Sequence, residues 1–129
     1  MVVVDTHAWI WWTDDPTRLS SKARDAIEKA DGIAVPAISC WELGMLWLSG
    51  RVTLDRDPSQ WVRQALAQPG VLALPLMPKV ALAAALLEHD GFVGDPADRM
   101  IYASARDAGA PLITGDARIR EFDPRATIW

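Results

Sequence analysis

Acidic side chains that follow short apolar runs are the residues of this sequence best suited to chemistry. Asp5 comes directly after Val2–Val4, and Asp116 follows the apolar run 112–114. The carboxyl ends of parallel strands meet at one edge of a sheet, where sites form. We therefore expect Asp5 and Asp116 to lie at the same edge, although either residue alone is better explained as a turn former.

Glu42 is the acidic residue most at odds with its neighbours. It lies in the predicted helix 38–48, whose sequence ISCWELGMLWL is apolar on nearly every face. Ile38, Met45 and Leu46 share its helical face. Burying an unpaired carboxylate costs several kcal/mol, so we expect Glu42 to be paired, metal-bound or protonated. The alternative is an exposed position or an ion pair with an arginine such as Arg51.

Two further acids open the predicted helix 96–108. Asp95 precedes Pro96 and is a natural N-cap, and Asp98 occupies the third helical position. Capping alone can explain acids at both places. However, Asp98 falls on the inward face that Ile101 and Ala105 mark, so it is the stronger functional candidate. Asp95 is predicted to be a cap and an outer ligand.

Four or five carboxylates that converge in one pocket define a particular chemistry. They repel one another strongly, so the pocket needs cations or raised pKa values. The ligands would all be oxygens, because the chain has one Cys and two His. This favours Mg²⁺ or Mn²⁺ over zinc. Such an ion suits phosphodiester hydrolysis, since it binds the phosphate, lowers the pKa of a bound water and stabilises transition-state charge.

Alternating strands and helices are predicted to position these acids. The 129 residues suit one domain. The alternation is typical of an α/β fold with a parallel, doubly wound sheet. We predict strands at 2–4, 33–35, 71–76, 112–114 and 126–128, helices at 6–13, 21–30, 38–48, 58–68, 78–88 and 96–108, and a turn at 115–116.

Composition narrows the class of protein. The net charge of −4 lacks the basic excess of a typical nucleic-acid binder, so RNA binding would need a local basic rim or metal ions. The single Cys40 excludes an intramolecular disulfide and favours a reducing, cytoplasmic setting. The apolar stretch 71–87 is broken by Pro75, Pro78 and Lys79 and falls short of the ~18 residues that a membrane span needs. The first fifteen residues contain no Lys or Arg, which argues against a secretory signal.

Three segments in order resemble a known family: VVVDTHAWIWW, ISCWELGML and GDPADRMIYASARDAGAPLITGDARI. The chain resembles PIN-domain ribonucleases, and specifically VapC-type toxins of bacterial type II toxin–antitoxin pairs. The resemblance implies a single PIN-like domain over 1–129, with a central, mainly parallel sheet flanked by helices in three layers. It makes catalytic, metal-binding acids of Asp5, Glu42, Asp98 and Asp116, leaves a metal role for Asp95 less certain, and makes Thr6 and Thr114 polar supports.

The resemblance also implies an activity and partners. Such enzymes cut RNA with Mg²⁺ in the cytoplasm, pair as homodimers and are silenced by an antitoxin whose tail lies across the site. We expect the Trp-rich helices to hold the antitoxin tail and the dimer contact, with no membrane involved. A basic rim for RNA would draw on Arg51, Arg56, Arg99, Arg118 and Arg120, each of which can instead be a solvated surface charge.

Two other functions stay open from the residues. A catalytically silent partner-binding protein would use the Trp surface and bind no metal. A receiver-type phosphate-accepting module would need an acceptor Asp after a middle strand and a Lys ending a later strand. Here the middle strands end at Pro36 and near Pro75, and Lys79 lies at a helix start, so the receiver reading fits poorly.

Overall fold

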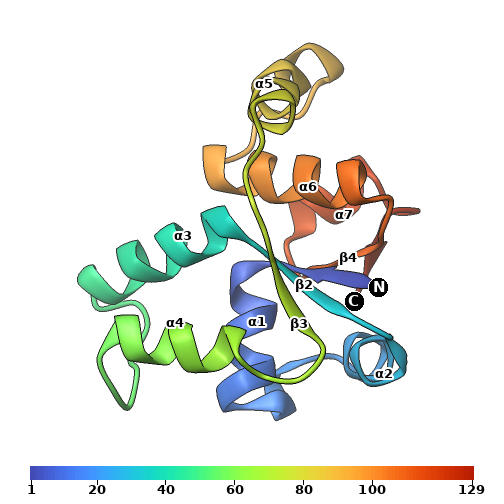
Figure 1. The fold of residues 1–129 in the computed structure, drawn as a ribbon. Coiled ribbons are helices and arrows are strands. Elements are labelled where there is room, and N and C mark those ends of the chain that lie inside the picture. The colour runs from blue at the N-terminus through green and yellow to red at the C-terminus, as the bar shows by residue number, and fades with distance from the viewer.

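A five-stranded, all-parallel sheet forms the centre of the computed structural model, which describes residues 1–129 (Figure 1). The strand order is β3-β2-β1-β4-β5. Val3 is paired with Ala34 on one side and Leu112 on the other, so β1 is the middle strand. The predicted α/β fold is confirmed. The strands are β1 (Val2–Val4), β2 (Ile33–Pro36), β3 (Val71–Leu74), β4 (Leu112–Ile113) and β5 (Thr127–Ile128).

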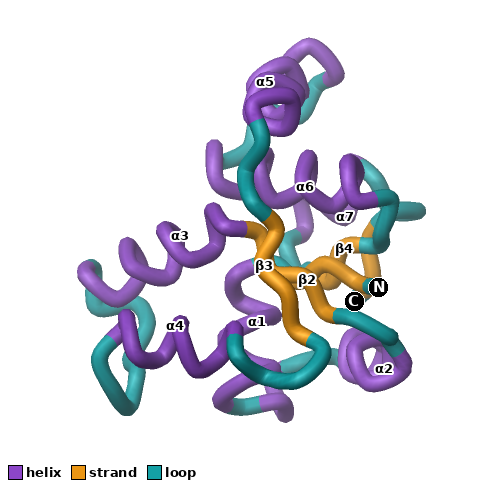
Figure 2. The backbone as a smooth tube through the Cα atoms, viewed as in Figure 1, coloured by secondary structure: helices purple, strands orange, loops and turns teal.

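The sheet separates two hydrophobic cores, because successive side chains of a strand point to opposite faces. Val2 and Val4 pack in one core with Trp9, whereas Val3 packs in the other with Ile101. Helices therefore cover both faces of the strands (Figure 2). The helices are α1 (Thr6–Asp14), α2 (Ser21–Lys29), α3 (Ala37–Leu48), α4 (Pro58–Leu66), α5 (Pro78–Leu86), α6 (Pro96–Ala108) and α7 (Ala117–Phe122), with 3₁₀ turns at Pro16–Arg18 and Leu87–Asp90.

Helix caps explain why most of the helices begin close to where the sequence predicts. Side-chain caps begin α1, α2, α4, α6 and α7. β3 ends at Leu74, two residues earlier than predicted, next to Pro75, which has no N–H to donate to a ladder. The predicted turn at 115–116 is incomplete as a description, because Asp116 is the N-cap of the short helix α7.

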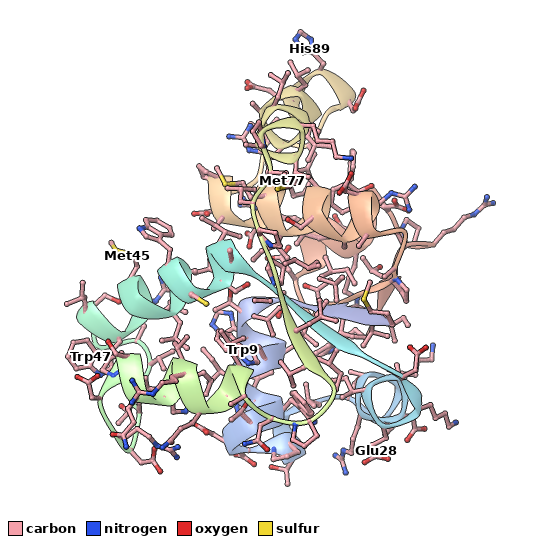
Figure 3. The ribbon with its side chains drawn as sticks, viewed as in Figure 1. Trp9, Glu28, Met45, Trp47, Met77 and His89 are labelled. Atoms are coloured by element: carbon pink, nitrogen blue, oxygen red, sulfur yellow. The ribbon has the colours of Figure 1, made fainter.

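The apolar helix α3 is not buried all round, contrary to the surroundings predicted for Glu42. Leu43 and Leu46 are buried, but Trp41 is 57% exposed and Leu48 72% exposed. The reason is that one side of α3 packs on the first core while the rest faces solvent, and Met45 and Trp47 project from different sides of the helix (Figure 3). We call Trp41, Met45 and Leu48 the α3 surface.

A second exposed apolar surface lies on α5. This helix packs on α6 rather than on the sheet (Figure 1). Leu82 is 60% exposed and Leu86 49% exposed. We call these two residues the α5 surface. Exposed apolar patches of this kind mark contact sites for other molecules. No helix of the structure is long and apolar enough to cross a membrane.

Candidate metal centre

The five predicted acids line one cavity of about 900 Å³. Asp5 and Asp116 reach it from beyond β1 and β4, as the parallel sheet predicts. Glu42 comes from α3, which lies between α1 and α6 (Figure 1). Asp95 and Asp98 come from the beginning of α6. The topology thus brings together acids that are more than 100 residues apart in the sequence.

Asp5 is the most deeply placed of these acids, with 9% of its surface exposed. Its carboxylate caps α1 by accepting from the Ala8 N–H at 2.8 Å, and its own N–H donates to the Ile113 carbonyl of β4. Burial raises the pKa of the Asp5 carboxyl, against hydrogen bonds from the Thr114 hydroxyl and the Ala8 N–H that lower it. A cation at this position would stabilise the charged form.

Thr114 and Thr6, the two predicted supports, are both buried beside these acids. The Thr114 hydroxyl oxygen accepts from the Asp116 N–H at 3.1 Å, so the same side chain contacts both strand-end acids. Thr6 lines the cavity, and its hydroxyl has no hydrogen-bond partner. A buried hydroxyl without a partner is costly, which makes Thr6 a group suited to meet a ligand in the cavity.

Asp116 and Asp95 are also helix caps. Asp116 accepts from the N–H groups of Arg118 and Ile119 at 2.9 and 3.1 Å, and Asp95 accepts from the Ala97 N–H at 2.9 Å. One carboxylate oxygen of each residue makes these bonds. The second oxygen of each carboxylate has no protein hydrogen bond.

Asp98 and Glu42 have no such anchor, since neither carboxylate makes a hydrogen bond or an ion pair. Burial first, and then the charges of Asp116, Glu42, Asp95 and Asp5 in that order, together raise the pKa of Asp98 from 3.8 to about 7. The shifted pKa of Asp98 thus reflects its burial and, after that, the like charges of the other carboxylates that line the cavity. Titrating groups perturbed in this way in a cleft are typical of functional sites.

The donor set fits a hard divalent cation. All the candidate ligands are carboxylate oxygens, and their mutual repulsion is the kind that a bound cation relieves. The acids face the cavity from separate walls, and no three acidic, His or Cys side chains stand as a ready-made cluster for an ion. Binding would therefore draw the side chains inward, and the unanchored Glu42 and Asp98 are the two with freedom to move.

Of the predicted basic rim, the structure brings only Arg51 to the cavity wall. Arg56 is paired with Asp55 at 2.8 Å, and Arg99 lies 3.9 Å from Glu88. Arg118 is exposed outside the set of lining residues, and Arg120 lines a different cavity.

Several cavity residues escaped the sequence reasoning, notably Trp11, Arg18 and Trp129. Trp11 lies in the Trp-rich helix that was expected to meet a partner, one helical turn after His7, which also lines the cavity. Arg18 and Trp129 carry no local signal. Trp129 reaches the cavity only because β5 pairs with β4.

Comparison with known proteins identifies the class of protein that this fold and site define. The chain belongs to the PIN-domain family, whose model matches residues 2–124. PIN-domain ribonucleases generally depend on a divalent metal. The chain is 43% identical to Ribonuclease VapC22 of Mycobacterium tuberculosis (strain ATCC 25618 / H37Rv), with 99% of this chain and 98% of the relative covered.

Solved structures share the fold at lower sequence identity. A toxin–antitoxin complex from Klebsiella pneumoniae is 17% identical with a TM-score of 0.69, covering 100% of this chain and 97% of that one. VapBC2 from Rickettsia felis, bound to a promoter DNA fragment, is 15% identical with a TM-score of 0.68 and coverages of 98% and 97%. Mycobacterium tuberculosis VapC20, a toxin that cleaves the sarcin–ricin loop, is 17% identical with a TM-score of 0.66 and coverages of 96% and 94%.

Proposed function

We propose that this chain is a Mg²⁺-dependent endoribonuclease that acts in the cytoplasm as the toxin of a toxin–antitoxin pair. Its full-length relationship to a ribonuclease of the VapC group supports the reaction class. The observation that carries the proposal is that five carboxylates line one cavity, where burial and the neighbouring charges together raise the pKa of Asp98 to about 7. A pocket with that charge is unfavourable for RNA phosphates until a cation reverses its sign.

The residues that would hold the ion are Asp5, Asp98 and Asp116, with Glu42 completing the set and Asp95 at the periphery. When bound, Mg²⁺ supplies positive charge for the scissile phosphate and lowers the pKa of an attacking water. Thr114 orients Asp5 through its hydrogen bond and fixes the backbone of Asp116. Arg51, in the same wall, has no carboxylate within ion-pair distance and is free to contact a phosphate.

The exposed apolar surfaces are the places where we propose protein partners to bind. The solved relatives include toxin–antitoxin complexes, which supports an antitoxin as one partner. The α3 surface lies on the helix that carries Glu42, so an antitoxin bound there would reach the cavity. The α5 surface, on the far side of α6, is left for a homodimer contact.

RNA cleavage by the purified chain tests the proposed activity. End-mapped cleavage should require Mg²⁺, stop in excess chelator and fall sharply in Asp5→Asn and Asp98→Asn. Asp25→Asn is the matched control, because Asp25 is an exposed acid of α2 outside the cavity. Undiminished cleavage by both cavity variants, or cleavage in chelator, would refute the proposal.

Metal binding separates the enzyme from a silent partner-binding protein. Titration calorimetry with Mn²⁺ should give heat that is reduced in Glu42→Gln and kept in Asp25→Asn. Absence of any Mn²⁺ heat in the wild-type chain would favour the binding protein over the nuclease.

A further inference from the structure

An aromatic and cationic wall lines the acidic cavity beside the candidate metal ligands. Arg18 lies over the ring of Trp11, with its guanidinium carbon 4.6 Å from the ring centroid. The ring of Trp129 stands 5.9 Å from that of Trp11 at an interplanar angle of 51°. All three side chains line the cavity. We call Trp11, Arg18 and Trp129 the Trp11 platform.

The platform is open to a ligand. Both tryptophan rings are partly exposed, and Arg18 is exposed. Arg18 has no carboxylate within ion-pair distance, although Asp14 and Asp15 line the same cavity. Those two acids already accept hydrogen bonds from Trp61 and Thr17. The charge of Arg18 is therefore left for another partner.

Gly115 fixes Trp129 beside the acids. A Cβ atom at Gly115 would lie 3.0 Å from Cε2 and Cζ2 of Trp129, so the ring packs directly on the glycine backbone. Gly115 precedes Asp116 in the chain, which places this ring next to a candidate metal ligand. Trp11 lies six residues after Asp5, or about 9 Å along the axis of α1. The platform is thus within reach of a nucleotide adjacent to one whose phosphate sits among the acids.

We infer that the Trp11 platform stacks the nucleobase next to the scissile phosphate, so that stacking on Trp129 and Arg18 contributes to the affinity for RNA. This inference rests on the proposed ribonuclease function. Unstacked bases stack on aromatic rings and on guanidinium planes, whereas a base inside a duplex has both faces covered by its neighbours. Trp129 and Arg18 contact the base, and Trp11 supports both of them from beneath.

Steady-state cleavage of a short unstructured RNA tests the platform. Trp129→Leu should raise KM about tenfold with little change in kcat, because stacking holds the base without entering the reaction. Trp129→Phe should recover most of the loss, and Arg18→Gln should weaken KM less than Trp129→Leu does. Trp12→Leu is the matched control, since Trp12 is a partly buried tryptophan of the same helix that does not line the cavity.

Abasic substrates distinguish base stacking by Trp129 from a purely structural role, because only stacking makes the KM depend on the base. Removing the base that meets the platform should cost the wild type about tenfold in KM and cost Trp129→Leu nothing further. A fully paired RNA of the same sequence should be cut poorly by both. An equal KM for Trp129→Leu and Trp12→Leu, or an abasic penalty that persists in Trp129→Leu, would overturn the inference.

Measuring RNA binding without cleavage tests the platform independently of the proposed nuclease activity. Fluorescence anisotropy of a labelled single strand, with Mg²⁺ and in an Asp98→Asn background, should show the same order of affinities without cleavage. A wild-type chain that never cuts RNA refutes the nuclease, and the same binding series then decides the platform separately. Urea unfolding of each variant confirms that it is folded.

Discussion

The acids of the cavity fall into two groups that differ in what holds them. Asp5, Asp95 and Asp116 are helix N-caps whose carboxylates accept backbone N–H groups. Glu42 and Asp98 lie within helices and make no hydrogen bond. The capped acids are thus fixed in place before any ligand arrives, and the free acids are not.

The helix caps and the uncompensated charge of Asp98 have opposite effects on folding. A capping Asp contributes about 1 kcal/mol to the stability of its helix. Asp98 opposes folding when charged, because it is brought among like charges in a partly desolvated place. The site therefore combines caps that stabilise their helices with a carboxylate, Asp98, that a cation would make favourable, and burial raises the pKa of the capped Asp5 in the same sense. The predictions below test this division.

The largest expected effect belongs to Asp98→Asn. Cleavage should fall on the order of a thousandfold, because the variant loses a charged group that faces the metal and the reacting phosphate. Its free energy of unfolding without metal should nevertheless be higher than that of the wild type at pH 8. Urea unfolding and RNA cleavage, with Asp25→Asn in parallel, measure both. A variant that is inactive and also less stable would break the comparison.

The pH dependence of stability should follow from the same carboxyl. The pKa of Asp98 is raised from 3.8 to about 7 on folding, so the folded chain binds the proton more tightly than the unfolded chain. Its stabilising contribution is complete below pH 4 and is lost as the pH rises toward and through about 7. The raised pKa of Asp5 acts in the same direction.

Metal-free chain should therefore lose on the order of 1–2 kcal/mol of unfolding free energy over this range, after allowance for solvent screening. Urea titrations at several pH values check this. Mg²⁺ should restore the stability at pH 8 in the wild type and do so much less in Asp98→Asn. Stability that rises with pH between 5 and 8 in both chains would contradict the assignment.

Local signals in the sequence identify both groups of acids, the free Glu42 and Asp98 by their helical faces and the capped ones by their place at the ends of elements. The pair Asp95–Pro96 identifies a cap without any knowledge of the fold. The strand before Asp5 places that acid at the sheet edge, although its role as the N-cap of α1 was not predicted. The fold itself follows from alternating strands and helices. The helix α7 was missed because six residues carry too little periodicity, and Gly115–Asp116 resembles a turn. Its cap, Asp116, was found for a different reason, namely its place after a strand.

Tertiary packing determines what the sequence could not predict. The apolar run of α3 indicated burial, but that helix has solvent on one side, so Glu42 is partly exposed at the cavity wall rather than enclosed. The pairing of arginines is likewise tertiary: Arg56 and Arg99 meet acids, whereas Arg51 meets the cavity. Trp129 and Arg18 meet through Trp11, a contact that no local pattern encodes.

Asp5 allows its two roles to be separated. Asp5→Asn keeps a side-chain oxygen for the Ala8 N–H but loses the charge, whereas Asp5→Ala loses both. Both variants should be inactive, and Asp5→Ala should be less stable than Asp5→Asn by about 1 kcal/mol. Cleavage assays and urea unfolding compare the two. Equal stabilities would mean that the cap contributes nothing and that Asp5 belongs with the free acids.

The smallest effect should belong to Asp95→Asn. Asn caps a helix as well as Asp does, so the unfolding free energy should change by less than about 0.5 kcal/mol. Cleavage should fall only severalfold, because Asp95 is exposed at the rim of the cavity. Loss of its charge also lowers the pKa of Asp98, which favours the charged carboxylate there.

Asp57→Asn is the control for Asp95→Asn, because it changes a helix cap without changing the charge of the cavity. Asp57 precedes Pro58 and caps α4 by accepting from the N–H groups of Ser59 and Gln60, whereas Asp95 accepts from that of Ala97 alone, and Asp57 does not line the cavity. The two variants should match in unfolding free energy and differ only in cleavage. If Asp95→Asn proves as inactive as Asp98→Asn, Asp95 is a principal ligand of the ion, and an N-cap anchored to the backbone does the same task as a free carboxylate. The distinction between acids fixed by capping and acids free to move would then fail for Asp95.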